Sequence, residues 1–488
     1  MRIRKAMLAF GAVALSTTAM AQVAPRYLNQ RDVQEAAQQH PQVLEEFGGA
    51  ETGPRGAYVQ AIGQKVAAYS GIANPGQSYR FTALNSAVEN AFAVPGGYVY
   101  ITRQLMGIMN DEAELAFVLG HETGHIAARH AQQRQSRSTR NSVLGVLGVL
   151  LGSVVGGGFG DLIAQGAQYS SQLGTLRFSR EQEYQSDQLG IRYITSAGYD
   201  PNAGASMLAA LTRSSALEAR IQGNSGRATP EWASTHPLSQ NRVNQAAQLA
   251  RQTGKATGLR NRDQFLAQLE GVYVDDDPAQ GVIDGRTFTH PDLRLQFSVP
   301  AGYQMQNGTR AVTISGTSGK AQFSTGQYQG DPGRYIQAVL YQLTGGKTQV
   351  QMGPIQRTQV NGVPAYYAVG RARTSSGTVD VGVFMYEMAR DRAYHFVTLS
   401  QGGAGLQPFG AMFNSFRPIS AAEASAIRPR VIDVHTVQRG ETVQSLAGRM
   451  AYRNFQLERF LSLNGLASNA SLAPGQKVKL VVYGTRRR

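Results

Sequence analysis

The sequence predicts a multidomain protein: a mainly α-helical domain with a small sheet, then an α+β domain, then a small βααβ domain. Three observations lead to this prediction. The 488 residues are too many for one typical domain and suggest two to four. Apolar residues recur at helical spacing through most of the first half, whereas strand-like alternation begins near residue 285. An acidic run that ends in proline, residues 275–278, is expected to be the linker between these two regions.

The first 21 residues have the pattern of a secretory signal. Basic residues at positions 2, 4 and 5 precede an apolar run, and a small-x-small cleavage site ends at Ala21. A membrane anchor is the alternative, but the apolar run is short for a membrane span. We therefore expect a protein that is exported to the periplasm or cell envelope and cleaved near Ala21.

Composition narrows the possible cofactors and partners. The chain contains no cysteine, which excludes disulfides and thiolate metal ligands. Any metal ion would therefore be held by histidine and carboxylate side chains. The formal net charge of +15 favours, for an exported chain, peripheral contact with anionic envelope surfaces over binding of nucleic acid.

The first domain is expected over residues 22–270. Its early part has apolar residues at helical spacing, and two strand-like runs follow, the second over residues 90–102 with a Pro-Gly-Gly turn. Asp111 and Glu114 have the spacing of a capping box, so a long helix is expected to begin there.

This helix carries the sequence His121-Glu122-Thr123-Gly124-His125. Residues four apart lie on one face of a helix, so His121 and His125 can bind one metal ion. Glu122 can reach a water molecule on the same ion and act as a general base. The motif thus predicts two of the ligands of a catalytic zinc site.

Glu183 is the best candidate for the third ligand. It lies on a second helix that is predicted over residues 175–197 and can pack across the first. Asp187, one turn further along the same face, can accept the free ring N–H of a ligand histidine and fix its tautomer. Glu181 points about 200° away from Glu183 and is the weaker choice.

The other histidines are expected to lie outside the site. His130 is rotated about 140° from the ligand face of a continuous helix, so it is expected to be solvated or to cap the helix. His40 precedes a proline in a loop-like stretch, and His290, His395 and His435 occupy strand or loop positions.

The motifs together resemble the zinc metallopeptidases of the HtpX, BepA and CAAX-prenyl-protease type. The HExxH helix is followed by Arg-Glu-x-Glu-Tyr-x-x-Asp over residues 180–187. Before it, Asn90–Gly97 matches the family's substrate-side strand, and after it Ser234–Pro237 with Arg242 matches another family motif. The resemblance covers roughly residues 25–255.

This resemblance implies one Zn2+ per chain, bound by His121, His125 and Glu183, with Glu122 as the general base. It implies a catalytic role for His236 and Arg242, either of which can stabilise the oxyanion. In some relatives the matching histidine instead blocks the metal and keeps the enzyme latent, and the sequence leaves this alternative open. Substrate would pair as an added strand along Asn90, Ala91, Phe92 and Ala93.

Residues 143–160 are apolar and rich in glycine. Three interpretations remain: a mobile flap over the active site, a buried helical hairpin in the core, or a segment that contacts the membrane. The many glycines and the cleaved signal argue against a full membrane span.

Residues 280–420 are expected to form an α+β domain of unknown role, because strand-like segments dominate and one helical stretch interrupts them. The domain faintly resembles small envelope domains of the PsbP/DcrB kind.

Residues 431–484 resemble a LysM domain. The expected order of elements is a strand, two short helices and a closing strand. Such domains usually bind N-acetylglucosamine chains of peptidoglycan or chitin. A packing module without a glycan is the alternative. The matching positions are Val437, Gly440-Glu441-Thr442, Leu446-Ala447, Asn464, Leu472 and Gly475-Gln476.

The leading hypothesis from the sequence is a secreted zinc endopeptidase that hydrolyses unfolded or misfolded envelope proteins, in protein quality control. The alternatives are a latent or chaperone-like envelope protein, a peptidoglycan-directed enzyme and a peptidoglycan-associated binding protein.

Overall fold

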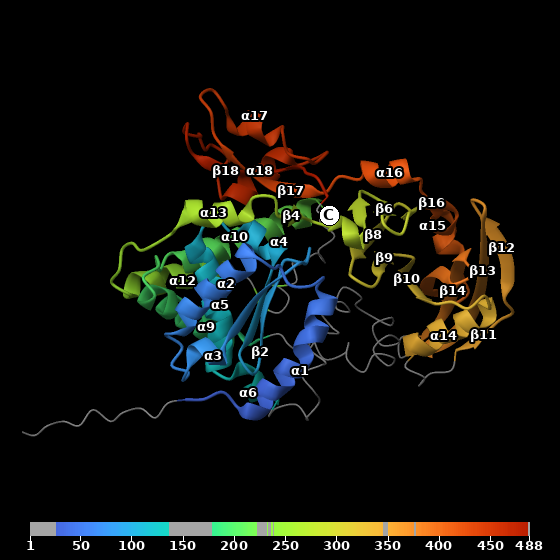
Figure 1. Ribbon diagram of the computed structural model, residues 1–488, viewed down its shortest axis with the longest axis horizontal. Helices are drawn as coiled ribbons and strands as arrows, with labels where there is room; N and C mark the ends of the chain where they lie inside the picture. Colours follow the sequence, from blue (N-terminus) through green and yellow to red (C-terminus); the bar gives the residue numbers. More distant parts are fainter. Residues whose placement is uncertain are drawn as a thin grey trace, which may run out of the picture.

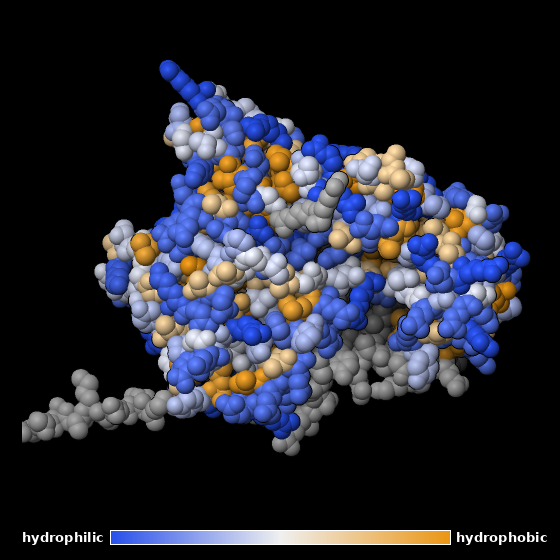
Figure 2. Space-filling view, viewed as in Figure 1, coloured by the Kyte–Doolittle hydropathy of each residue, from blue (hydrophilic) through white to orange (hydrophobic). Residues whose placement is uncertain are grey.

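The computed structural model describes residues 26–135, 178–221, 232, 236–237, 239–344, 350–374 and 377–486. The predicted signal peptide, the segment 143–160 and the Ser234-Thr235 pair lie outside the described residues. No described helix is both long and apolar enough to cross a membrane. The face of the molecule in Figure 2 is mainly hydrophilic, with small scattered apolar areas.

The expected multidomain arrangement is confirmed: a helical region, a region rich in β-strands and a small C-terminal unit lie beside one another (Figure 1). The domain boundaries proposed from the sequence remain predictions. The helices of the first region are α1 (Gln30–Glu46), α2 (Pro54–Ala67), α3 (Pro75–Ser78), α4 (Arg103–Ile108), α5 (Glu112–Ala127), α6 (His130–Gln135), α9 (Arg180–Ser196), α10 (Ala203–Ile221), α12 (Gln240–Gln252) and α13 (Arg262–Leu269).

Helix α5 forms the centre of the helical region, and all of its residues are buried. It begins where the sequence predicted, because the Asp111 side chain accepts a hydrogen bond from the Glu114 backbone N–H. We expected this helix to continue to the polar stretch that begins at Gln132, but it ends at Ala127. Arg129 has a φ of 58°, a left-handed conformation that ends one helix and lets α6 begin in a new direction.

Helices α5 and α9 pack closely because glycines face each other at their crossing. A Cβ atom on Gly190 would lie 3.1 Å from the backbone nitrogen of His121. A Cβ on Gly124 would lie 3.4 Å from the Cα of Ser186. The absence of side chains lets the two backbones approach. As a result, the metal-binding motif on α5 faces the first turns of α9.

A small sheet lies next to these helices, with strand order β1-β3-β2. Its strands are β1 (Arg80–Leu84), β2 (Ala91–Val94) and β3 (Tyr98–Thr102). β1 runs parallel to β3, and β2 runs antiparallel to it. Within the described chain β2 is therefore an edge strand, with one side available for another strand.

His40 was expected in a loop, but it lies inside α1, which continues through Pro41. The proline removes one backbone hydrogen bond without ending this helix. The His40 ring lies 2.8 Å from the hydroxyl of Tyr100.

The β-rich region contains two sheets. The four-stranded sheet has the order β16-β7-β6-β5, and the eight-stranded sheet has β11-β13-β14-β15-β10-β9-β8, with β12 paired to β13. An aromatic core fills one face of the large sheet and α14 covers the other. The elements are β5 (Val282–Asp284), β6 (Thr287–His290), β7 (Leu295–Ser298), β8 (Tyr303–Asn307), β9 (Val312–Gly316), β10 (Gly319–Gln327), α14 (Pro332–Thr344), β11 (Gln351–Met352), β12 (Gln356–Val360), β13 (Val363–Thr374), β14 (Gly377–Ala389), β15 (Arg392–Gln401), α15 (Gly410–Ser415), β16 (Arg417–Pro418) and α16 (Ala421–Ala426).

The expected linker at residues 275–278 is an ordered part of the fold. Asp277 caps a short 3-10 helix and also accepts a hydrogen bond from the Asn85 side chain. Arg103 donates to the backbone carbonyls of Tyr273 and Asp275, both at 2.7 Å. These contacts fix the junction between the helical and β-rich regions, and the linker role of residues 275–278 stays a prediction.

The C-terminal unit has the expected strand-helix-helix-strand order: β17 (Arg430–Thr436), α17 (Val443–Ala447), α18 (Gln456–Asn464) and β18 (Lys477–Tyr483). It is joined to the helical region by a shared sheet of order β18-β17-β4, where β4 is Tyr273–Val274. The buried ammonium of Lys479 donates to the carbonyls of Gly107 and Met109, just before α5. The unit is thus packed onto the helical region.

Candidate metal centre

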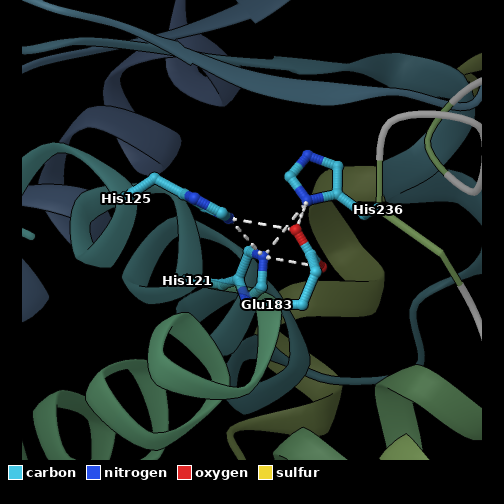
Figure 3. A group of neighbouring side chains, drawn as sticks. All are labelled: His121, His125, Glu183 and His236. Atoms are coloured by element: carbon cyan, nitrogen blue, oxygen red, sulfur yellow. Dashed lines mark hydrogen bonds and ion pairs between the residues drawn. The ribbon is translucent and has the colours of Figure 1, made fainter. Parts of the chain in front are cut away.

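Four buried side chains from three segments converge at one point in the helical region (Figure 3). They are His121 and His125 from α5, Glu183 from α9, and His236 from the segment before α12. One potential ligand atom from each lies within 4.8 Å of those of the other three. Elsewhere in the described parts of the chain there is no second group of this kind.

The atoms of this group face one another directly. The Nε2 atoms of His121 and His125 are 3.0 Å apart. His236 Nδ1 lies 3.3 Å from His121 Nε2 and 2.9 Å from Glu183 Oε1. The structure therefore brings together the three residues that the sequence predicted as ligands and adds His236 as a fourth.

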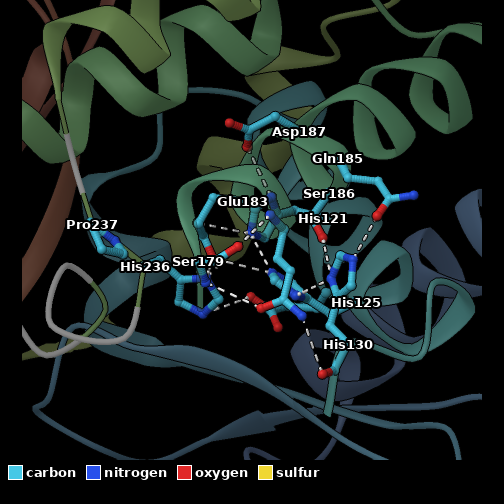
Figure 4. A network of polar contacts seen from close by, with 12 residues as sticks. His121, His125, His130, Ser179, Glu183, Gln185, Ser186, Asp187, His236 and Pro237 are labelled. Atoms are coloured by element: carbon cyan, nitrogen blue, oxygen red, sulfur yellow. Dashed lines mark hydrogen bonds and ion pairs between the residues drawn. The ribbon is translucent and has the colours of Figure 1, made fainter. Parts of the chain in front are cut away.

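Asp187 lies behind His121, where the sequence placed it (Figure 4). Its Oδ1 atom is 2.9 Å from His121 Nδ1. Burial alone would raise the pKa of Asp187, but the adjacent Arg242 and His121 hold that pKa below its usual value. Asp187 is therefore an anion that can accept the Nδ1–H of His121, which leaves Nε2 of His121 with a free electron pair.

Arg242 occupies a different place from the one expected of an oxyanion-stabilising group. Its Nε and Nη2 atoms donate to both oxygens of Asp187, at 2.9 and 2.7 Å. Its Nη1 atom lies 2.7 Å from Glu183 Oε2 and 3.2 Å from the carbonyl oxygen of Pro237. The position of α12 thus directs the Arg242 guanidinium at the carboxylates of Asp187 and Glu183.

His130 is neither solvated nor a simple cap, so that prediction was wrong. It is fully buried, and its Nδ1 atom lies 2.9 Å from His125 Nδ1. The rotation of about 140° applies to one continuous helix. Here the left-handed Arg129 ends α5 and turns His130 back toward the site.

The converging atoms fit a divalent metal ion. Burial alone would raise the pKa of Glu183, but His236, His125 and Arg242 hold that pKa well below its usual value, so the carboxylate is ionised. Burial lowers the pKa of His125 well below its usual value, which favours a neutral ring with a free electron pair. Electron pairs that face one another at such short range repel unless a cation lies among them. Imidazole nitrogens with a carboxylate are ligands that zinc and similar metals accept.

Glu122 lies next to this group and is almost fully buried. Its Oε1 atom is 3.6 Å from His236 Nε2. The same oxygen has no hydrogen-bond partner among the described residues. A buried carboxylate oxygen without a partner is available to a substrate or water molecule beside the metal centre.

Residues 54–250 match the profile of peptidase family M48, and residues 435–481 match that of the LysM domain. The chain carries an M48 peptidase domain. The likeness to metallopeptidases with a C-terminal LysM domain is thereby confirmed, and the M48 domain belongs to a family of metalloendopeptidases.

Curated relatives match mainly through the M48 domain. The β-barrel assembly-enhancing protease of Yersinia pestis is 29% identical over 226 residues, 45% of this chain and 44% of the relative. The protein of that name in Escherichia coli K12 is 27% identical over 222 residues, 44% of this chain and 43% of the relative. The mitochondrial metalloendopeptidase OMA1 of Schizosaccharomyces pombe is 30% identical over 191 residues, 39% of this chain and 51% of the relative. This chain thus spans about half the length of these relatives or less.

A solved structure of cyanobacterial PsbP from Synechocystis aligns with 28% of this chain and 98% of its own, at 10% identity and a TM-score of 0.22. A TM-score this low carries no argument. The faint resemblance of the β-rich region to such domains stays a prediction.

Trp232 is a part of the M48 domain's site that the sequence analysis missed. Its ring stacks on His236 with centroids 4.7 Å apart and an angle of 17° between the planes. Its backbone N–H donates to the carbonyl of Glu89, two residues before β2, at 3.2 Å. Trp232 is the single tryptophan of the chain and lies four residues before His236. This position in the sequence could have identified it as part of the site.

The predicted substrate strand of the M48 domain is β2, together with Asn90 before it. Both side-chain amide atoms of Asn90 are buried and without a hydrogen-bond partner among the described residues. β2 also contacts α5. Unsatisfied buried amide groups are costly, so Asn90 is suited to bind a polar group that is supplied from outside the fold.

Proposed function

We propose that the protein is a zinc-dependent endopeptidase of the cell envelope that hydrolyses unfolded or misfolded proteins. The observation that carries this proposal is the convergence of four buried ligand atoms within 4.8 Å, with the Glu122 carboxylate beside them. A site of this composition, on an M48 domain, is suited to the hydrolysis of peptide bonds.

In this proposal His121, His125 and Glu183 hold one zinc ion per chain. A bound zinc ion supplies a Lewis acid that activates water and polarises the peptide carbonyl. Glu122 is the general base that takes a proton from water and returns it to the leaving amine. Asp187 orients His121 and keeps the Nε2 atom of His121 unprotonated. Arg242 stabilises the negative charges of Asp187 and Glu183.

The substrate is proposed to add as a strand to the free side of β2. Backbone groups of β2 would bind the backbone of the peptide and make few demands on its side chains. The Asn90 amide would bind one peptide group beside the scissile bond. An extended chain of any sequence fits such a site, which is why unfolded proteins are the proposed substrates.

The position of His236 supports a second candidate, a latent form of the same enzyme. Its Nδ1 atom lies among the ligand atoms, where it would be a fourth protein ligand to a bound metal ion and would compete with water. Trp232 stacks on the ring, and its backbone N–H donates to the carbonyl of Glu89, two residues before β2. Activation would then require the Trp232–His236 segment to move away from the metal.

The compartment is proposed from the signal-like N-terminus and from the relatives named as β-barrel assembly-enhancing proteases. By the same likeness we propose a role in quality control of envelope proteins. The LysM domain is proposed to bind peptidoglycan, because its loops at residues 438–440 and 467–469 are exposed. Peripheral contact with anionic surfaces, from the net charge, is part of this proposal.

The test is cleavage of β-casein, an unfolded protein, by the wild type and by Glu122→Gln and His236→Ala. EDTA is expected to abolish cleavage by the wild type, and added zinc to restore it. Glu122→Gln is expected to reduce cleavage at least about a hundredfold, because the general base is lost, while zinc content and unfolding temperature stay unchanged. If the wild type is latent, His236→Ala cleaves faster than the wild type.

Measurable cleavage that is equal in the wild type and Glu122→Gln, or that is insensitive to EDTA, would refute the zinc-endopeptidase proposal, as would the absence of cleavage by both the wild type and His236→Ala. A His236→Ala variant that is slower than the wild type would instead assign His236 to transition-state stabilisation and would reject latency.

A further inference from the structure

The ring of His130 lies behind His125, next to the nitrogen that does not face the other ligands. His130 Nδ1 is 2.9 Å from His125 Nδ1, and His130 Nε2 is 2.9 Å from Gln185 Oε1. The three side chains form a row of two hydrogen bonds from α5 through α6 to α9 (Figure 4). Because His130 is fully buried, bulk water does not compete for these contacts.

The hydrogen atoms in this row can be assigned from simple donor and acceptor rules. A hydrogen bond between two ring nitrogens needs one donor and one acceptor, and an amide oxygen can only accept. Gln185 Oε1 therefore accepts the hydrogen of His130 Nε2. A neutral His130 then has a bare Nδ1, which accepts the hydrogen of His125 Nδ1.

This assignment determines the state of His125 at its other nitrogen. With the hydrogen on Nδ1, the Nε2 atom of His125 has a free electron pair. Nε2 is the atom that lies 3.0 Å from His121 Nε2 and 3.5 Å from Glu183 Oε1. The opposite assignment would place a hydrogen on Nε2, and this form cannot bind a metal ion through Nε2, the atom that faces the other ligands.

We propose that His130, aligned by Gln185, is a positioning residue that fixes the tautomer and orientation of His125 for zinc binding. The proposal rests on the proposed function, in which zinc is bound at this site. The two ligand histidines are then oriented by different partners. His121 faces the anionic Asp187 at 2.9 Å, whereas His125 faces a neutral imidazole.

The backbone explains how His130 reaches this place. Arg129 has a φ of 58°, and α6 begins at His130 immediately after it. Gln182 on α9 donates to the carbonyl oxygen of His130 at 3.4 Å. Ser186 Oγ lies 3.3 Å from His130 Nδ1, which is a longer contact than the one from His125. Ser186 therefore provides a matched control at the same nitrogen.

The test measures zinc affinity by competition with a chromophoric chelator for the wild type, His130→Leu, His130→Asn and Ser186→Ala. His130→Leu is expected to bind zinc about 10- to 100-fold more weakly, the usual effect of losing a partner of a ligand histidine. His130→Asn should stay within about threefold of the wild type, because its amide oxygen can accept the same hydrogen. Ser186→Ala should match the wild type. Thermal unfolding without metal checks that each variant is folded.

A second measurement does not depend on any variant. Nuclear magnetic resonance of the zinc-loaded wild type with 15N-labelled histidine reads the tautomer of each ring, and we expect hydrogen on Nδ1 of His125 and on Nε2 of His130. Hydrogen on Nδ1 of His130 would overturn the proposal, as would wild-type zinc affinity in His130→Leu or equal losses in the Leu and Asn variants. Failure of the wild type to bind zinc is a separate result, which would refute the proposed function itself.

Discussion

Strand β17, at the start of the C-terminal unit, fills part of the core of the helical region, and the substitution Ile432→Ala measures this contribution. Ile432 lies on β17 and is fully buried within the hydrophobic cluster of the helical region. Its backbone N–H donates to the carbonyl of Val272 at 2.9 Å, and its carbonyl accepts from Gly271 at 2.8 Å. The side chain reaches α4, where a Cβ atom on Gly107 would lie 3.4 Å from its Cδ1 atom.

The expected loss follows from the burial of this side chain. Replacing a fully buried isoleucine with alanine costs about 2–5 kcal/mol through lost burial and the cavity that remains. A loss of about 3 kcal/mol corresponds to a fall in unfolding temperature of roughly 6–12 °C for a unit of this size. Amides of α5 that exchange through global opening should exchange on the order of a hundredfold faster.

The assay is hydrogen exchange and calorimetry on the full chain, with Leu480→Ala as the matched control. Leu480 is also fully buried, but it belongs to the LysM domain's own cluster. Its loss is expected to raise exchange mainly in β17, β18, α17 and α18. If Ile432→Ala leaves exchange in α5 at the wild-type rate, the LysM domain is an independent unit and the reasoning is refuted.

Two further predictions follow from buried charge and protonation. Asp187→Ala should weaken zinc binding about 10- to 100-fold, because His121 loses its hydrogen-bond partner. The same substitution should destabilise the fold by about 3 kcal/mol, because the buried Arg242 loses its bidentate contact. Chelator competition and thermal unfolding measure these effects, and wild-type zinc affinity would contradict the role of Asp187. Burial lowers the pKa of His395 to about 4. Because the unfolded chain then binds more protons between about pH 4 and 6.5, the β-rich region should lose up to about 3 kcal/mol of stability as the pH falls through this window. His395→Leu should flatten that dependence in unfolding at a series of pH values, and an unchanged slope would contradict it.

The core of the candidate metal site was predictable because its rules are local. Helical periodicity places His121 and His125 on one face, and the same periodicity favours Glu183 over the exposed Glu181. The start of α5 followed from the capping position of Asp111. The absence of cysteine limited the ligands to histidine and carboxylate in advance.

The surroundings of the site depend on long-range packing, so the sequence did not predict them. One left-handed residue, Arg129, decides that His130 contacts His125. Arg242 was expected near the oxyanion, but the packing of α12 directs it to Asp187. Lys479 attaches the LysM domain by contacts to Gly107 and Met109, which lie 372 and 370 residues earlier in the sequence.

The central claim is that one zinc ion is held by His121, His125 and Glu183. The most direct measurement is a crystal structure of the zinc-loaded full chain combined with metal analysis. We predict one zinc ion per chain, bound to both histidines of α5 and to Glu183, and a fourth bond to His236 would support the latent form. A chain that remains metal-free after loading with zinc, or a zinc ion bound away from Glu183, would contradict the account.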